Sequence, residues 1–328
     1  MTSVIEPTVD VIRGDVAESP TLLALFALHV AICLVALFFN FLLLFLLYKY
    51  TVFHYHMTVI CINLTTAVII CLGYLLLRSL LGLYQINHRT PTSETDQKDA
   101  FCVFDELVPQ ALCVLFFVFP LLLVTERTYA TRRFWVYEYE NFRPVVMLVC
   151  LAVWLPTLGQ NARTLVGWTT PTSLAACQVL LLRKTFLQRN FWFIVVSAFS
   201  LLYMILFKIL EKQNKRNEED YVANHYSTIS IRFQIRENVK TCRFFVSLNF
   251  LFLLTFLLFF VFDQDMDDDK YSPSVLTRKE STFLVFPMFG LLYALHFIFS
   301  HTQLFEKAKR TLRQLAASHG EQEKMFEP

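Results

Sequence analysis

The stretch Phe244–Phe262 reads FFVSLNFLFLLTFLLFFVF and contains no charged residue. An α-helix needs about 20 apolar residues to cross the roughly 30 Å of hydrocarbon in a bilayer, so this run predicts a transmembrane helix. Six comparable stretches occur elsewhere, at Leu22–Tyr48, Met57–Leu83, Cys102–Thr125, Pro144–Gln160, Phe191–Leu210 and Phe283–Ser300. Together they predict an all-α membrane protein, a seven-transmembrane helix bundle.

The composition supports a helical membrane protein. The chain has 328 residues, of which 55% are apolar, and its mean hydropathy is +0.48. Soluble domains are about 45–50% apolar. Phenylalanine occurs 34 times and glycine only 7 times, which favours lipid-facing helices over a β-barrel with its many turns. A net charge of +2 without a basic stripe gives no indication of nucleic acid as a partner.

The orientation follows from the distribution of lysine and arginine between the spans. The segments around Arg127–Arg143 and Lys208–Arg243, with the C-terminal tail, hold the larger share of these residues. Because cytoplasmic segments are enriched in Lys and Arg, we expect the N-terminus outside and the C-terminus inside. The predicted organisation is an extracellular segment (1–20), a seven-helix domain (21–300) and a cytoplasmic tail (301–328).

The tail carries apolar residues at helical spacing, with basic residues over much of the rest. This pattern predicts a short amphipathic helix on the inner leaflet after the seventh span. The apolar positions are Leu304, Phe305, Ala308, Leu312 and Leu315.

Two of the eight cysteines face the side predicted to be extracellular, namely Cys102 and Cys177. An oxidising compartment favours a disulfide between them, which would hold the loop before the fifth span over the bundle. The alternative is two unpaired thiols. We expect the remaining cysteines, in the spans or on the cytoplasmic side, to stay reduced.

The third span ends in Glu126-Arg127, and its other end carries Cys102. The two ends lie about 37 Å apart at 1.5 Å per residue. An acid–arginine pair alone could be an interfacial anchor. The combination resembles the third helix of rhodopsin-like G-protein-coupled receptors. That resemblance implies an arginine held by its neighbouring acid at rest and released when the inner helix ends separate.

Three further motifs resemble nematode serpentine chemoreceptors of the Sra superfamily. The stretch ERTYAT at 126–131 with YEYE at 137–140 is similar to their "ER-aromatic-AT … YE" pattern. FHYHM at 53–57 is similar to "FH-x-N-L", and SIRFQIREN at 230–238 to "S-x-R-Y-Q-x-x-E-N". The stretch LRSLLGLYQI at 77–86 makes the Sre class the first choice, with Srab and Sra next. The rhodopsin-type "NPxxY" and "CWxP" motifs are missing, so only the Glu126–Arg127 element is carried over from the wider class.

The resemblance implies a chemosensory G-protein-coupled receptor in the plasma membrane of sensory neurons. Its partners would be a small molecule on the outer side, a heterotrimeric G protein on the inner side and the lipid bilayer. Glu126, Arg127, Arg232 and Arg236 are the candidate residues for activation and G-protein coupling. The charged segment Lys208–Arg243 is either a pair of solvated helix extensions or a docking surface, and both can hold.

Ionisable and polar residues near the outer helix ends are the candidates for a ligand pocket, because such groups are costly within a membrane. They are Arg78, Glu106 and Gln110. Arg78 and Glu106 could form a salt bridge or contact a polar ligand. We expect no catalytic residues, no metal and no cofactor, and hence no enzyme.

Two other classes of seven-helix or similar membrane protein are open alternatives. A ligand-gated cation channel of the insect odorant-receptor kind would have its N-terminus inside, so accessible tags on both termini would distinguish it. A small-molecule transporter would show repeat symmetry and interrupted helices with polar midpoints, which the sequence lacks.

Overall fold

The computed structural model describes residues 20–50, 53–87, 100–135, 137, 142–167, 186–223, 229–263 and 273–325, and at several helix ends, including 100–112, only the backbone. These residues are almost entirely helical. The helices are α2 (Pro20–Lys49), α3 (Tyr55–Asn87), α4 (Ala100–Arg132), α5 (Arg143–Gly167), α7 (Phe186–Ala223), α8 (Ile229–Asp263), α9 (Pro273–Phe283), α10 (Val285–Ser300) and α11 (Thr302–Met325).

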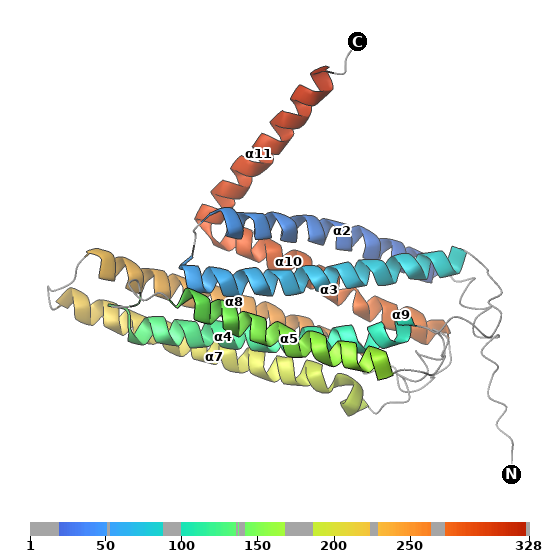
Figure 1. Cartoon of the computed structure of the whole chain (residues 1–328), viewed down its shortest axis with the longest axis horizontal. Helices are drawn as coiled ribbons and strands as arrows, with labels where there is room; N and C mark the ends of the chain where they lie inside the picture. The colour runs from blue at the N-terminus through green and yellow to red at the C-terminus, as the bar shows by residue number, and fades with distance from the viewer. Residues whose placement is uncertain are drawn as a thin grey trace.

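Seven of these helices, α2, α3, α4, α5, α7, α8 and α10, run roughly parallel or antiparallel in one elongated bundle (Figure 1). Among the described residues, six stretches are long and apolar enough to cross a membrane, including Pro20–Lys49 in α2 and Glu280–Ser300 across α9 and α10. The seventh helix, α5, has 25 residues and would be about 37 Å long, enough by length to cross, although its described apolar part is only Arg143–Leu155. The predicted seven-helix membrane bundle is confirmed.

The outside of the bundle is apolar, as expected of a surface that faces lipid. Leu34 on α2, Leu148 on α5 and Phe250 on α8 are each more than half exposed. A water-soluble protein rarely leaves an apolar surface of this extent uncovered. The core is also apolar and rich in phenylalanine; Phe207 and Phe245, for example, stack at 5.2 Å between α7 and α8.

The seventh crossing is broken between α9 and α10 at Leu284. Pro287 has no backbone N–H, and its ring clashes with the carbonyl four residues earlier, that of Phe283. The helix therefore ends at Phe283 and restarts at Val285, with a tighter turn in which Leu284 N–H donates to Ser281 O at 3.2 Å.

A glycine allows α10 to approach α3 closely. A Cβ at Gly290 would lie 2.8 Å from Leu72 Cδ2, so a larger residue there would force the Leu72 side chain or the helices to shift. The Gly290 carbonyl accepts a hydrogen bond from the buried Asn40 side chain of α2 at 2.8 Å. Helices α2, α3 and α10 thus form one tightly packed part of the bundle.

Helices α7 and α8 project beyond the other helices at one end (Figure 1). Both continue through the charged segment 208–243, so this segment is helical wherever it is described. This agrees with the interpretation as helix extensions.

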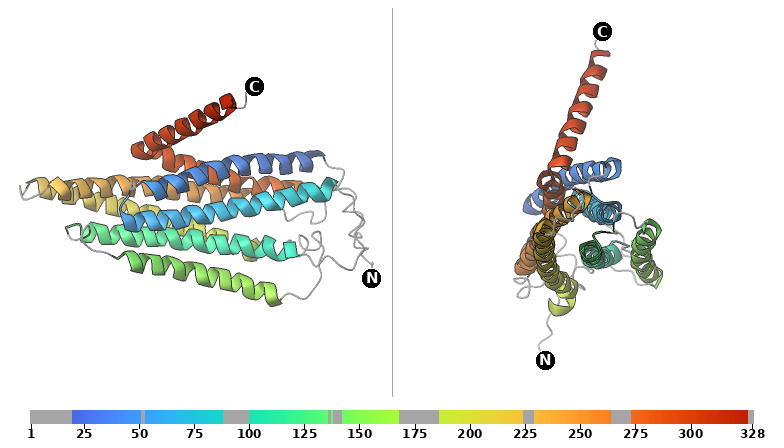
Figure 2. Two further views of the ribbon diagram at one scale, coloured as in Figure 1. Left: turned by 45° about the horizontal axis from the view of Figure 1, so that its top comes forward. Right: turned by 90° about the vertical axis from the view of Figure 1, so that its left-hand side faces the viewer.

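Helix α11 leaves the bundle near that same end and extends away from it at an oblique angle to the long axis (Figure 2). Leu304 and Ala308 are buried at its start, whereas Phe305 and Leu312 remain exposed. The amphipathic helix on the inner leaflet stays a prediction, because its side chains are described only as far as Gln314.

Candidate functional site

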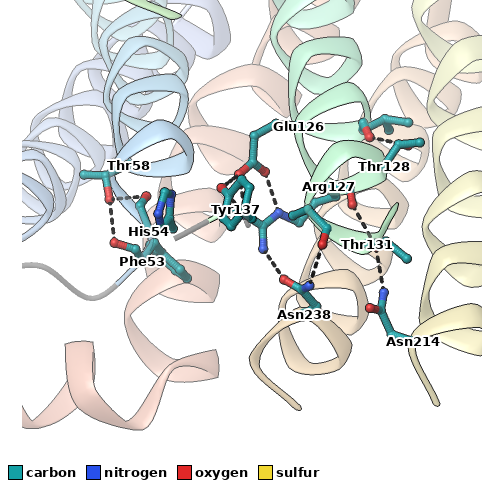
Figure 3. Close-up of polar contacts among 12 residues, drawn as sticks. Phe53, His54, Thr58, Glu126, Arg127, Thr128, Thr131, Tyr137, Asn214 and Asn238 are labelled. Atoms are coloured by element: carbon teal, nitrogen blue, oxygen red, sulfur yellow. Dashed lines mark hydrogen bonds and ion pairs between the residues drawn. The ribbon is translucent and has the colours of Figure 1, made fainter. Parts of the chain in front are cut away.

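Arg127 lies in the last turns of α4 and is only 3% exposed. Its Nε donates to Glu126 Oε2 at 2.5 Å, and its Nη2 donates to the other oxygen of the same carboxylate. Two parallel hydrogen bonds between guanidinium and carboxylate form the strongest common ion-pair geometry. The predicted acid–arginine pair is therefore present, and it is buried in the helix bundle (Figure 3).

Tyr137, in the connection between α4 and α5, completes this ion pair. Its hydroxyl accepts a hydrogen bond from Arg127 Nη2 at 3.1 Å and donates one to Glu126. Burial, together with the nearby carboxylate, raises the pKa of Tyr137 well above its usual value. The hydroxyl therefore stays protonated and available as a donor at physiological pH.

Asn238 on α8 is the partner that ties Arg127 to another helix. Arg127 Nη1 donates to Asn238 Oδ1 at 2.8 Å, and both side chains are buried. The Asn238 amide group also lies 3.5 Å from the carbonyl of Ala130 on α4. We call Glu126, Arg127, Tyr137 and Asn238 the Arg127 cluster, and the end of the bundle that holds it the Arg127 end.

A second polar link joins α4 to α7 at the same level. Asn214 Nδ2 donates to Thr131 Oγ1 at 2.8 Å, and the Thr131 hydroxyl donates to the Arg127 carbonyl at 2.7 Å (Figure 3). Asn214 is fully buried. The end of α4 is thus held to α7 and to α8 by separate hydrogen bonds.

Charged side chains join the projecting parts of α7 and α8. Glu211 is buried and lies within 2.9–3.2 Å of three cations, those of Lys208, Lys215 and Arg243. Further out, Arg236 Nε donates to Glu218 Oε1 at 2.6 Å, although the Arg236 side chain is 65% exposed. Arg232 lies one turn before Arg236 on α8, so these two of the four predicted coupling residues are on the projecting helix pair.

His54 packs against the Arg127 cluster from the start of α3, with its ring 4.2 Å from that of Tyr137. Burial lowers the pKa of His54 to about 4. The nearby charges of His56, Arg127 and Arg143 also lower this pKa, whereas the Glu126 carboxylate raises it. A histidine whose pKa is lower in the folded state stabilises that state above its ordinary pKa of about 6.5, and this contribution is lost as the pH falls toward 4.

We therefore expect the thermal unfolding midpoint of the purified protein to fall between pH 7.5 and pH 5. A His54→Gln variant, which has no titrating group at this position, should show a smaller fall. The measurement is thermal unfolding of both proteins in detergent across this range. Equal pH dependence of the two proteins would show that protonation of His54 does not destabilise the folded state.

A second buried ion pair lies toward the opposite end of the bundle, where α3 ends and α9 leads into α10. Arg78 Nη1 and Nη2 each lie 2.5 Å from a carboxylate oxygen of Glu280, and Glu280 is fully buried. The Arg78 guanidinium also lies over the ring of Phe283, 4.7 Å from its centre. We call this end the Arg78 end.

A cavity lies between the helices beside this ion pair. Its volume is about 20 Å³, room for about one water molecule, and it is partly open to the surroundings. The side chains that line it come from α3, α4, α7, α8, α9 and α10. The lining residues are Cys71, Tyr74, Leu75, Cys113, Phe116, Phe193, Phe256, Phe283 and Phe286.

Several predicted residues fall outside the described side chains. Cys102, Glu106 and Gln110 lie in the first part of α4, where only the backbone is described, and Cys177 lies outside the described residues altogether. The disulfide and the Arg78–Glu106 pair thus stay predictions. The six other cysteines are unpaired.

The sequence analysis gave no role to three residues that the structure brings into the two clusters. Tyr137 and Asn238 stand in the motifs that carry the family resemblance, but a motif does not show which side chains meet. Only one feature of the sequence pointed to Glu280 as a functional residue: it is an acidic residue a few positions before the apolar seventh span. Its contact with Arg78 depends on how α3 and α9 pack.

The sequence matches the serpentine type 7TM GPCR receptor class ab chemoreceptor family over residues 11–327. The chain belongs to this family. The match covers the Arg127 cluster, the Arg78–Glu280 pair and all seven crossings, so the chain is a multi-pass membrane receptor of a chemosensory class.

The matched class is ab, Srab, rather than Sre, the first choice within the Sra superfamily. The superfamily resemblance is confirmed, and the preference for Sre has no support from the match. The receptor matches none of the curated proteins with which it was compared.

Proposed function

We propose that this receptor binds a small molecule at the Arg78 end, which faces outward, and signals to a heterotrimeric G protein at the Arg127 end, which faces the cytoplasm. The observation that carries the proposal is the burial of Arg127. Its guanidinium is held at once by Glu126, Tyr137 and Asn238, from α4, the α4–α5 connection and α8. This arrangement corresponds to a resting state.

The Arg127–Asn238 hydrogen bond is the contact that helix movement would break. Glu126 is the neighbour of Arg127 on α4, so this pair moves as a unit. Asn238 is on α8 and would leave Arg127 if the two helices separated. The freed guanidinium would then be available to the G protein. Ligands can favour such a state only by binding it more tightly than the resting state.

Helix α8 contributes residues both to the cavity beside the Arg78–Glu280 pair and to the Arg127 cluster. Phe256 lines the cavity, and Asn238 lies on the same helix about 27 Å away at 1.5 Å per residue. A molecule that displaces α8 at the cavity can therefore act on Asn238 through a single rigid element. The projecting parts of α7 and α8, with Arg232 and Arg236, supply the docking surface.

The test is a G-protein reporter in cells that express the receptor, screened with odorants. We expect Arg127→Ala to remove at least 90% of the response to any active odorant while the receptor still reaches the cell surface, as measured by labelling an N-terminal tag on intact cells. A full odorant response in Arg127→Ala would refute the proposed role of this residue.

A further inference from the structure

Two lysine side chains from different helices meet on one tyrosine ring at the Arg127 end. Tyr50 directly follows α2, and Lys307 lies in the second turn of α11, which begins beside that end of α2 (Figure 1). The Lys307 ammonium lies 4.6 Å from the centre of the Tyr50 ring, and the Lys49 ammonium lies 5.7 Å from it. We call Lys49, Tyr50 and Lys307 the Tyr50 corner.

The Tyr50 corner carries two positive charges that the described residues do not neutralise. Neither Lys49 nor Lys307 forms an ion pair with a carboxylate in the part of the chain that the structure describes, not even with the sequence neighbour Glu306. The face of a tyrosine ring attracts an ammonium group but does not cancel its charge. Two like charges held on one ring repel each other, so an anion that contacts both would stabilise this arrangement.

The corner lies where the apolar surface of α2 ends. The membrane-spanning stretch Pro20–Lys49 finishes there, and Tyr48 is 85% exposed. The Lys49 ammonium also lies 5.1 Å from the ring of Phe45, one turn back into the apolar stretch. Exposed aromatic rings and lysines at the end of a span are typical of the boundary between membrane and water. The Tyr50 corner is therefore at the level of the lipid headgroups.

An apolar strip leads from this corner along α2. Phe41, Phe45 and Lys49 are spaced by four residues, so they lie on one face of the helix. Phe41 is 54% exposed and Phe45 is 43% exposed. A free phosphate ion or an acidic peptide would use only the two charges. A phospholipid would use the charges for its phosphate and the exposed rings for its acyl chains, so it fits the whole surface.

We propose that the Tyr50 corner binds the headgroup of an anionic phospholipid, in the leaflet at the Arg127 end. Lys49 and Lys307 contact the lipid phosphate, Tyr50 keeps the two ammonium groups together, and the acyl chains lie along Phe41 and Phe45. The bound lipid connects the start of α11 to the end of α2. This site goes beyond the proposed function, because it involves neither the small-molecule ligand nor the G protein.

The test compares two phospholipids that have the same acyl chains, phosphatidylserine (anionic) and phosphatidylcholine (zwitterionic). The full-length protein is purified in detergent and titrated with each lipid, and the affinity for the first bound lipid is measured by native mass spectrometry. We expect phosphatidylserine to bind at least about tenfold more tightly, since each lysine near a membrane surface contributes to the attraction of anionic lipid.

Two double variants remove the same charge from different places. Lys49→Gln with Lys307→Gln should weaken phosphatidylserine binding about 30-fold, because it removes both ammonium groups of the corner. Lys309→Gln with Arg310→Gln removes two exposed charges from α11 that have no described contact with Tyr50, and should leave the affinity nearly unchanged. Tyr50→Leu keeps both lysines but loses the ring between them, so its loss of affinity should be intermediate.

Inorganic phosphate, added as a competitor at the same concentration as the lipid, should not displace phosphatidylserine. Displacement by phosphate would show a site for a free anion and would overturn the proposal. Equal losses of affinity in the two double variants would also overturn it, as would equal binding of the two lipids to the unmodified protein. None of these measurements needs an odorant or a G protein, so their outcome is independent of the signalling role of Arg127.

Discussion

Replacing Asn238 with leucine is expected to raise signalling in the absence of ligand by about tenfold or more. The substitution keeps the shape of the side chain but removes the acceptor that α8 offers to Arg127 at 2.8 Å. Hydrogen bonds to charged groups contribute about 1.5–3 kcal/mol, and 1.4 kcal/mol corresponds to a tenfold change in an equilibrium. Because the bond exists only while α4 and α8 lie together, its loss shifts the population toward the separated state.

The matched control is Asn249→Leu. Asn249 lies on the same helix and is also buried, but its side-chain amide donates to Phe245 O within α8. The change is the same in chemistry and burial, without a link to α4. Ligand-independent signalling in this variant should stay at the wild-type level. An equal rise in both variants would show that any loss of an asparagine from α8 activates the receptor, and would contradict a specific role for Asn238.

Removing one partner of the Arg78–Glu280 pair is expected to have the largest effect on folding. Glu280→Ala would leave the guanidinium of Arg78 buried without its carboxylate, and loss of one member of a buried ion pair typically costs about 3–5 kcal/mol. The amount of receptor at the cell surface should fall severely, and the unfolding midpoint of the remainder should drop. Surface labelling and thermal unfolding measure these two effects.

Replacing both partners with methionine separates the cost of an unpaired charge from the cost of lost packing. Apolar residues of similar volume often replace a buried ion pair with little loss of stability. We expect the Arg78→Met, Glu280→Met variant to recover most of the surface expression. The exposed ion pair between Arg236 and Glu218 supplies the control, since Arg236→Gln should lower the free energy of unfolding by no more than about 1 kcal/mol. A double variant as unstable as Glu280→Ala would argue against charge burial as the cause.

The crossings could be predicted from the sequence because each depends on local composition alone. Phe244–Phe262 can only be a span, and the proline at 287 marks the crossing that the structure shows to be broken. The positions of the helix ends were harder to predict from the sequence. Helices α7 and α8 continue into the charged segment at 208–243, where hydropathy falls although helix geometry does not change.

The Glu126–Arg127 pair was also predictable, because the two residues are neighbours in the sequence and their contact does not depend on how the helices pack. The other contacts depend on which helix lies beside which. Asn238 contacts Arg127 from a position 111 residues away in the sequence, and Glu280 contacts Arg78 across 202 residues. A polar residue in an apolar helix signals that it has a partner, but the partner is decided by the fold.

The central claim is that Arg127, once released from Asn238, drives signalling. The most direct test is the ligand-independent reporter signal of Asn238→Leu with and without Arg127→Ala, at matched surface expression. The account predicts that Asn238→Leu signals above wild type and that adding Arg127→Ala returns the signal to background. A raised signal that persists in the double variant would contradict it.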